Sequence, residues 1–187
     1  MEKLLDYSGE LQSVLRLDDF SSDTLAGLCQ VTDRLYCGLD RIWYSLIRER
    51  FGEEMARELD REVWRIQTPI EVSRCRQAMN IWGNDVASVL KFLQVHPAAA
   101  GVYPEAECEL KDKNHGILTI KHCLGLDYYR RYSDWALQKY VCEILDVEGF
   151  QDAAHLINPN IKVTPLKLPS QDSQDDIACQ WEFKLEE

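Results

Sequence analysis

Three cysteines and a histidine in the second half of the chain are the side chains best suited to catalysis or metal binding. His122 and Cys123 end one expected strand, Cys142 lies in an expected helix, and Cys179 lies in the last expected strand. Brought together, they could form a zinc site, or an activated thiol with His122 as its base. Zinc sites usually take two ligands from one tight turn, so this wide spacing favours buried, unreactive thiols instead.

We therefore expect no cofactor, with zinc as the less favoured alternative, and we keep His122, Cys142 and Cys179 as catalytic candidates. The simplest alternative for His122 is a core or rim histidine that hydrogen-bonds to the backbone. The chain has no GxxxxGK[ST] phosphate loop, no GxGxxG turn, no GxSxG elbow and no HExxH helix. These absences count against a nucleotide-dependent enzyme, a common serine hydrolase and a zincin.

Aromatic residues and two adjacent arginines indicate a second kind of site, a pocket for a small organic ligand. Trp43 lies on one face of an expected helix, Trp64 lies on the next helix, and Trp181 lies on the last strand. Ligand pockets combine such aromatic walls with a few polar groups, although core packing explains the same residues equally well. Arg130 and Arg131 could hold a carboxylate through paired hydrogen bonds, and a solvated face is their simpler alternative.

Alternation of apolar and polar residues along the second half of the chain predicts its strands. The last twelve residues, DIACQWEFKLEE, alternate between apolar and polar side chains, which predicts a strand with one buried face. ECELKDK and GILTIKHC flank NHG, as is typical of a β-hairpin. IKVTPLKL also reads as a strand, and its Pro165 places it at an edge or a bulge.

Helical periodicity dominates the first half. Between Ser22, an expected N-cap, and Gly52, an expected stop, apolar residues recur at alternating steps of three and four. This first stripe consists of Leu25, Leu28, Thr32, Leu35, Leu39, Ile42 and Leu46. Cys29, Tyr36 and Trp43 form a second stripe beside it, and we hypothesise a homodimer through this second stripe.

Further helices are expected after Gly52. One covers roughly residues 53–66 with an inward stripe of Met55, Leu59, Val63 and Ile66. The next begins at TPIE, where Thr68 caps the helix and Pro69 takes the first helical position. Another follows WGND with Asn84 or Asp85 as its cap, and its inward stripe is Val86, Val89, Leu90 and Leu93. Later, DWALQKYVCEILDVEG follows Ser133 as a capped helix, and FQDAAHLIN is a shorter one.

The expected fold class is α+β, with an N-terminal helical subdomain packed against a C-terminal antiparallel sheet of two hairpins joined by a helical connection. We place the helical subdomain at residues 1–96, a connector at 97–104 and the α+β subdomain at 105–187. The change of period at the Pro- and Gly-bearing connector sets these boundaries. The whole is expected to form one compact unit.

Charge and composition restrict the partners. Among 187 residues, 21 Lys and Arg face 32 Asp and Glu, and the net charge of −11 disfavours nucleic acid and anionic membranes. The expected partner is a small-molecule ligand. The first ten residues lack the pattern of a secretory signal, so we expect a cytoplasmic location and seven reduced cysteines.

Three segments carry a resemblance to a known family. WYSLIRERFG, VWRI and above all INPNIKVTPLKLPSQDSQDDIACQWEFKLEE resemble uncharacterised proteins allied to the L-2-amino-thiazoline-4-carboxylic acid hydrolase-like family. The shared pattern is an NPxIxV strand, a proline-bearing loop and a closing CxWEF strand. More remotely, Cys142 and Cys179 match the outline of 4-vinyl reductase-type ligand-binding domains. The resemblance implies helices packed on an antiparallel sheet around a ligand cavity.

The same resemblance implies an activity, the hydrolytic opening of a cyclic C–N bond in a small carboxylate-bearing ring. No catalytic motif transfers with it. Under this hypothesis His122 is the base, Cys142 or Cys179 is the nucleophile, and Arg130 or Arg131 holds the carboxylate. The favoured function is binding of a small organic ligand between the helices and the sheet, with the hydrolase and the dimeric interaction module as alternatives.

Overall fold

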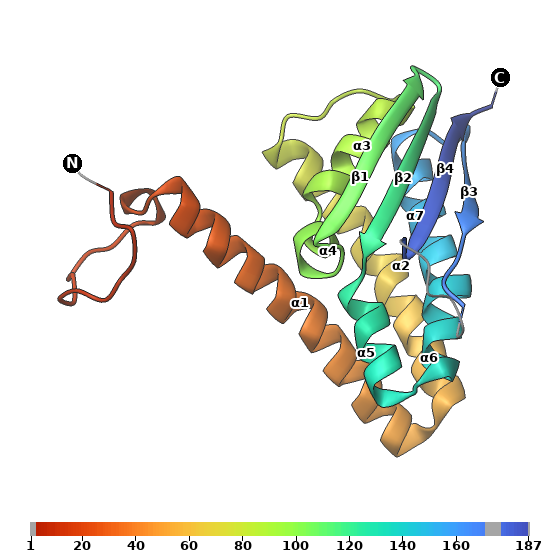
Figure 1. Ribbon diagram of the computed structural model, residues 1–187, viewed down its shortest axis with the longest axis horizontal. Coiled ribbons are helices and arrows are strands. Elements are labelled where there is room, and N and C mark those ends of the chain that lie inside the picture. Colours follow the sequence, from red (N-terminus) through yellow and green to blue (C-terminus); the bar gives the residue numbers. More distant parts are fainter. Residues whose placement is uncertain (1–2, 171–176, 187) are drawn as a thin grey trace.

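The computed structural model describes residues 3–170 and 177–186. It confirms the α+β class, with helices first and a four-stranded antiparallel sheet in the second half (Figure 1). The helices are η1 Leu17–Asp19, α1 Ser22–Phe51, α2 Glu53–Ala78, α3 Val86–Val95, α4 Pro97–Gly101, α5 Leu124–Tyr132, α6 Trp135–Tyr140, η2 Val141–Leu145 and α7 Asp146–Ile157. The strands are β1 Glu105–Asp112, β2 His115–His122, β3 Ile161–Lys167 and β4 Cys179–Leu185.

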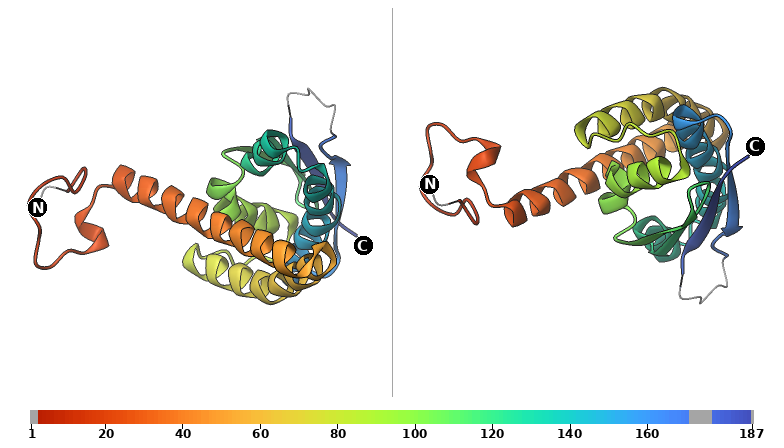
Figure 2. Two further views of the ribbon diagram at one scale, coloured as in Figure 1. Left: turned by 90° about the horizontal axis from the view of Figure 1, so that it is seen from below. Right: turned by 90° about the horizontal axis from the view of Figure 1, so that it is seen from above.

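Helix α1 is a single long helix, as its periodicity predicts. Its N-cap is Ser21, one residue before the predicted cap, and the Ser21 hydroxyl accepts a hydrogen bond from the Thr24 N–H. Gly52 ends the helix with a φ of 90°, a conformation that other residues adopt only under strain. The first turns of α1 extend away from the rest of the molecule, together with residues 3–20 (Figures 1 and 2).

The predicted dimer through the second stripe of α1 required the leucine stripe to be the buried face of this helix, and the structure shows the opposite. Its leucine stripe faces outward, with Leu35 68% and Leu39 66% exposed. Tyr36 and Trp43, from the second stripe, are half-buried instead. Periodicity defines stripes on a helix, but it does not say which stripe the rest of the fold covers.

The predicted break before Pro69 is wrong, because α2 runs without interruption from Glu53 to Ala78. A proline inside a helix removes one backbone hydrogen bond. Helix α2 packs along α1 and α7, and Thr68 and Val72 are buried on either side of the proline. This packing on both sides of Pro69 stabilises the helical path that local sequence disfavours.

The inward stripe predicted for residues 53–66 is wrong for three of its four residues, and only Leu59 is half-buried. Met55, Val63 and Ile66 are exposed, whereas α2 buries Ala56 and Asp60. The buried face therefore carries a small side chain and a carboxylate, which hydrophobic periodicity does not select. By contrast, α3 buries its predicted stripe and takes Asp85 as its N-cap.

The strand order in the sheet is β1-β2-β4-β3, with every neighbouring pair antiparallel. Both predicted hairpins are present, and Pro165 lies on the edge strand β3 beside a register shift. Segment 171–176, which contains the predicted beginning of the last strand, lies outside the described residues. The predicted break between two helices near Phe150 is absent, because η2 leads directly into α7.

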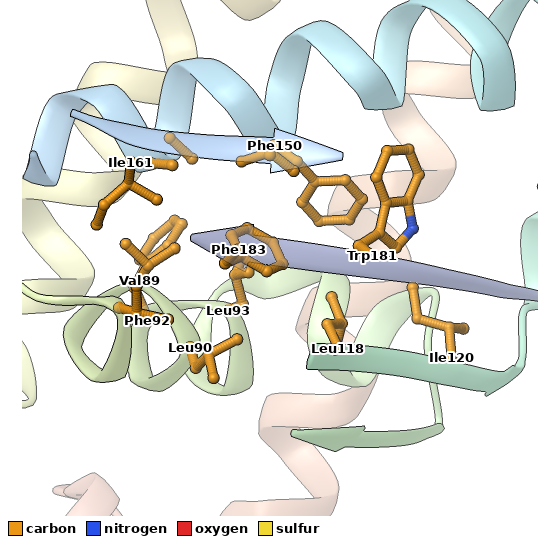
Figure 3. Close-up of a cluster of buried hydrophobic side chains, with 14 of the residues drawn as sticks. Val89, Leu90, Phe92, Leu93, Leu118, Ile120, Phe150, Ile161, Trp181 and Phe183 are labelled. Carbon is orange, nitrogen blue, oxygen red and sulfur yellow. The ribbon is translucent and has the colours of Figure 1, made fainter. Parts of the chain in front are cut away.

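Helices α3 and α7 cover one face of the sheet and enclose the main core (Figure 3). The fully buried Trp181 and Phe183 of β4 point into this core, as their alternation predicts. The Trp181 and Phe150 rings lie 4.7 Å apart between centroids. Within residues 3–170 and 177–186, no helix combines the length and apolar character that crossing a bilayer requires.

Candidate ligand-binding cavity

A cavity of about 950 Å³ opens between the helices. All seven α-helices of the described residues, α1 to α7, and the π-helical turn η2 contribute to its walls. This volume is at the upper end of the range found for small-molecule sites. None of the described strand residues lines the cavity, so its walls are helical and not shared with the sheet.

A close approach of two helices shapes one end of the cavity. Gly101 ends α4 against α1, where an added Cβ atom would lie 2.8 Å from the Asp33 carbonyl oxygen. Only glycine permits this approach without movement of the backbone. Gly101 lines the cavity beside Cys37 and Tyr103.

Aromatic side chains from several helices line the cavity. Tyr36 of α1 and Trp64 of α2 meet edge to face, with ring centroids 6.5 Å apart. The Tyr36 hydroxyl donates a 2.6 Å hydrogen bond to Glu71 Oε1. Tyr103 and Tyr129 also line the cavity, and burial raises the pKa of both well above that of free tyrosine. The phenols therefore remain neutral.

Asp60 is the most deeply buried carboxylate on the cavity wall, with 2% of its surface exposed. One of its oxygens, Oδ2, accepts a 3.1 Å hydrogen bond from the Tyr140 hydroxyl. The other oxygen, Oδ1, makes no hydrogen bond of ordinary geometry in the described part of the chain, and the nearby Trp64 indole N–H only partly offsets the effect of burial on the pKa of this carboxyl. Burial raises the pKa of Asp60 to about 6.

Two half-buried aspartates line the same cavity from other helices, Asp40 of α1 and Asp146 of α7, and the exposed Asp152 of α7 lies at its edge. Burial raises the pKa of each to about 7, and repulsion from Asp60 contributes to both shifts. Glu71 adds to the repulsion at Asp40, and burial raises its own pKa as well. No ion pair joins these four carboxylates to a basic side chain of the described residues.

The four arginines on the cavity wall, Arg34, Arg41, Arg61 and Arg65, are exposed, and three of them contact other residues of the wall. Arg61 forms an ion pair with Glu148 at 2.5 Å, and the Arg41 guanidinium lies 4.3 Å from the centroid of the Tyr128 ring. Arg65 lies 3.8 Å from Glu62. The interior is therefore acidic and aromatic, whereas positive charge is confined to exposed positions at its edge.

Two nitrogen atoms on the cavity wall, like Asp60 Oδ1, make no hydrogen bond among the described residues. Trp64 Nε1 and His96 Nε2 are buried and have no hydrogen-bond partner among the described residues. Both residues line the cavity. Burial lowers the pKa of His96 to about 4, so its imidazole is neutral at neutral pH.

Three predicted thiols meet beside this cavity. Cys123, Cys142 and Cys179 surround a hollow of about 20 Å³, and Cys123 and Cys142 also line the large cavity. Burial raises the pKa of Cys123 to about 11 and of Cys179 to about 12, and it raises that of Cys142 further. The thiols are therefore protonated at neutral pH, which makes them poor nucleophiles. Among the described residues, no three or more His, Cys, Asp or Glu side chains are arranged so that they could hold a metal ion.

His122 lies apart from the three thiols. Its Nε2 atom lies 2.6 Å from Asp127 Oδ2, and its Nδ1 atom lies 3.8 Å from Glu105 Oε1. His122 is half-exposed and lines neither the cavity nor the hollow. The structure therefore does not bring His122 together with Cys142 and Cys179.

The remaining predicted binding residues are divided between the cavity and other places. Trp64 lines the cavity, and Trp181 lines the small hollow, where its indole N–H donates a 3.2 Å hydrogen bond to Cys179 Sγ. Trp43 is half-buried on α1 but is not on the cavity wall. Arg130 and Arg131 are exposed on α5 and are not on that wall either.

The three aspartates are functional candidates that sequence reasoning missed. The spacing of these residues could have identified Asp40, because Tyr36, Asp40 and Tyr44 recur at steps of four and so share one face of α1. On α2, Asp60 and Trp64 share a face in the same way. An acidic residue between aromatic residues on one helical face indicates a buried carboxylate.

Comparison with known proteins gives one match. A family model described as a family of unknown function, DUF6125, matches residues 18–185. No curated protein and no solved structure matches the chain.

Proposed function

Because the chain belongs to the DUF6125 family, whose function is unknown, we propose a function from its geometry: it binds a small organic ligand in the cavity between its helices. The observation that carries this proposal is the set of unpaired polar atoms on the wall. Asp60 Oδ1, Trp64 Nε1 and His96 Nε2 are all buried without a partner among the described residues. Buried polar groups are normally hydrogen-bonded, and a bound ligand would supply the missing partners.

The π-helical turn η2 supports the same proposal. It contributes Val141, Cys142 and Leu145 to the cavity wall. Such turns interrupt regular α-helix at an energetic cost and occur frequently at functional sites. Here the turn lies at the junction of α6 and α7, directly before Asp146.

Gly149 allows a direct test of ligand binding. It lines the cavity from α7, and an added Cβ atom would have no neighbour within 4 Å. We expect Gly149→Phe to fill part of the cavity and abolish binding of small aromatic fragments, measured by ligand-observed NMR. Gly149→Ala is the matched control and should retain binding. Equal fragment binding by both variants and the parent protein would contradict a site in this cavity.

A hydrolase acting on a cyclic C–N bond of a small carboxylate-bearing ring is a second candidate. The observation that favours it is the position of Asp40 and Asp146 on the wall of one cavity, where burial raises the pKa of each to about 7, a value that suits general acid–base catalysis near neutral pH. L-2-amino-thiazoline-4-carboxylate incubated with the protein, followed by chromatography, tests this candidate. An Asp146→Asn variant should lose any turnover, and turnover unchanged in that variant would exclude this role for Asp146.

A cytoplasmic location is part of the proposal. All seven cysteines are free thiols in the structure, which is the state maintained in a reducing compartment. Attachment of a fluorescent protein to the full chain, followed by cell fractionation, tests the location. Recovery with membranes or in a secreted fraction would contradict it.

A further inference from the structure

The buried carboxylates of the cavity limit the charge of its ligand. Asp40, Asp60 and Asp146 come from three different helices and face the same cavity. Asp60 has one unpaired oxygen although it is almost fully buried. Ionised groups are rarely buried without a counter-charge, because removing them from water is costly.

We propose that this cavity takes an organic cation whose protonated amine or quaternary ammonium group lies at Asp60 Oδ1, with Asp40 and Asp146 as neighbouring carboxylates. The inference rests on the proposed function and deepens it. An ammonium group would supply the counter-charge that the described part of the protein does not supply. An anionic ligand would instead add repulsion to a site where three carboxylates already repel one another.

The aromatic walls favour the same class of ligand. Tyr36 and Trp64 adjoin the acidic wall, and their ring faces attract cations when water is excluded. The rest of the ligand would contact apolar wall residues such as Phe92 and Leu137. The expected ligand is thus an amine or ammonium group on a largely apolar or aromatic body.

A charge-matched ligand series tests this inference on the unmodified protein. Benzylamine, benzyl alcohol and benzoate share an aromatic body and differ in charge, and calorimetric titration measures the binding of each. We expect benzylamine to bind roughly tenfold or more tightly than the other two, the ratio that corresponds to about 1.4 kcal/mol. Equal or tighter binding of benzoate or benzyl alcohol would overturn the cation inference while leaving cavity binding intact.

Two variants test whether Asp60 is the carboxylate that binds the ammonium group. Asp60→Asn should weaken benzylamine binding roughly tenfold, whereas Asp18→Asn should leave it unchanged. The control removes the same charge from an exposed position in η1, away from the cavity. If both variants weakened binding equally, the cause would be the lower net charge of the protein, and the role of Asp60 would be overturned. Failure of all three compounds to bind would overturn both the inference and the proposed function.

A separate observation concerns the outward stripe of α1. Leu25, Leu28, Thr32, Leu35, Leu39, Ile42 and Leu46 follow heptad spacing over three heptads. Most of this stripe is exposed, and Ile42 is 55% exposed. The first turns of the same helix extend beyond the rest of the molecule (Figure 2).

We infer that this leucine stripe pairs with the same stripe of a second copy. Heptad positions a and d of one helix fill the holes between the same positions of another helix. The flanking positions carry no charged residue from Thr24 to Leu46: one flank is Cys29, Tyr36 and Trp43, and the other is Thr24, Val31, Gly38 and Ser45. Each chain has a net charge of −11, but the leucine stripe and its flanks carry no charge. Two copies paired through this stripe would therefore not repel each other there.

Light scattering after size exclusion tests the pairing. The parent protein is expected to be a dimer at micromolar concentration, and Leu35→Lys combined with Leu39→Lys should give a monomer. Leu110→Lys combined with Leu156→Lys is the matched control, because both leucines are exposed outside α1 and the pair should remain dimeric. A monomeric parent protein, or a dimer that survives the α1 substitutions, would overturn the inference.

Discussion

The Tyr140 hydroxyl donates a 3.1 Å hydrogen bond to Asp60 Oδ2 and leaves Oδ1 of the same buried carboxylate unpaired. Tyr140 is also buried, and its hydroxyl lies 3.1 Å from the Arg57 carbonyl oxygen. The single proton of this hydroxyl is shared between the Arg57 carbonyl oxygen and Asp60 Oδ2, and it is the donor that contacts Oδ2.

Removal of that hydroxyl should destabilise the protein. Tyr140→Phe leaves Asp60 buried without its donor, and we expect the free energy of unfolding to fall by about 1–3 kcal/mol. Urea titration followed by circular dichroism measures the change. Tyr132→Phe is the control, because Tyr132 is exposed, and it should change stability by less than about 0.5 kcal/mol. An equally small effect of Tyr140→Phe would contradict the role of this hydrogen bond.

The raised pKa values predict a loss of stability as the pH rises. Burial raises the pKa of Asp146 in the folded state to about 7 from its ordinary value of 3.8, so between these values the folded state binds more protons than the unfolded state. The free energy of unfolding must therefore fall through this window. We expect this contribution to fall by on the order of 1–3 kcal/mol between about pH 5 and about pH 8.

An Asp146→Asn variant isolates this contribution. The neighbouring Asp40, Asp60 and Glu71 have raised pKa values too, whereas burial lowers that of His96 and gives it the opposite slope at acid pH. Because these groups remain in both proteins, the difference between parent and variant measures chiefly Asp146. Stability that falls by the same amount in both proteins would contradict a raised pKa at Asp146.

Buried thiols should resist modification. Cys142 and Cys179 are buried with raised pKa values, whereas Cys29 is exposed. In the native protein we expect iodoacetamide to modify Cys29 first and the two buried thiols much more slowly, because their thiols stay protonated. Peptide mass spectrometry over time gives the individual rates. Cys142 reacting faster than Cys29 would restore it as a catalytic nucleophile.

Trp181 should be a major determinant of stability through packing. It is fully buried against Phe150, so Trp181→Ala should lower the free energy of unfolding by about 3–5 kcal/mol. Trp82→Ala, at a position that is 66% exposed, is the control and should have a small effect. Similar losses in both variants would show that the packing of Trp181 is not what stabilises this region.

Sequence patterns predicted the elements in which apolar side chains face the core. The alternation of β4 correctly placed Trp181 and Phe183 inward, and the spacing of α3 correctly identified its buried stripe. In these elements the buried face is also the hydrophobic one. The same rule failed on α1, where the hydrophobic stripe is exposed and Tyr44 is the buried residue.

The cavity could be predicted only in part. Trp64 and Cys142 were identified, because aromatic rings and thiols stand out as candidates in any sequence. Asp40, Asp60 and Asp146 were missed, because carboxylates are usually solvated and their burial here depends on the packing of three helices. The helix through Pro69 was missed for a similar reason, since tertiary packing overrides the local preference of proline.

A crystal structure determined after soaking the crystals in benzylamine would show whether an organic cation binds at Asp60. We expect density for the compound inside the helical cavity, with its nitrogen within hydrogen-bonding distance of Asp60 Oδ1. A cavity filled by the protein's own side chains, or density found only outside the walls formed by α1, α2 and α7, would contradict this expectation.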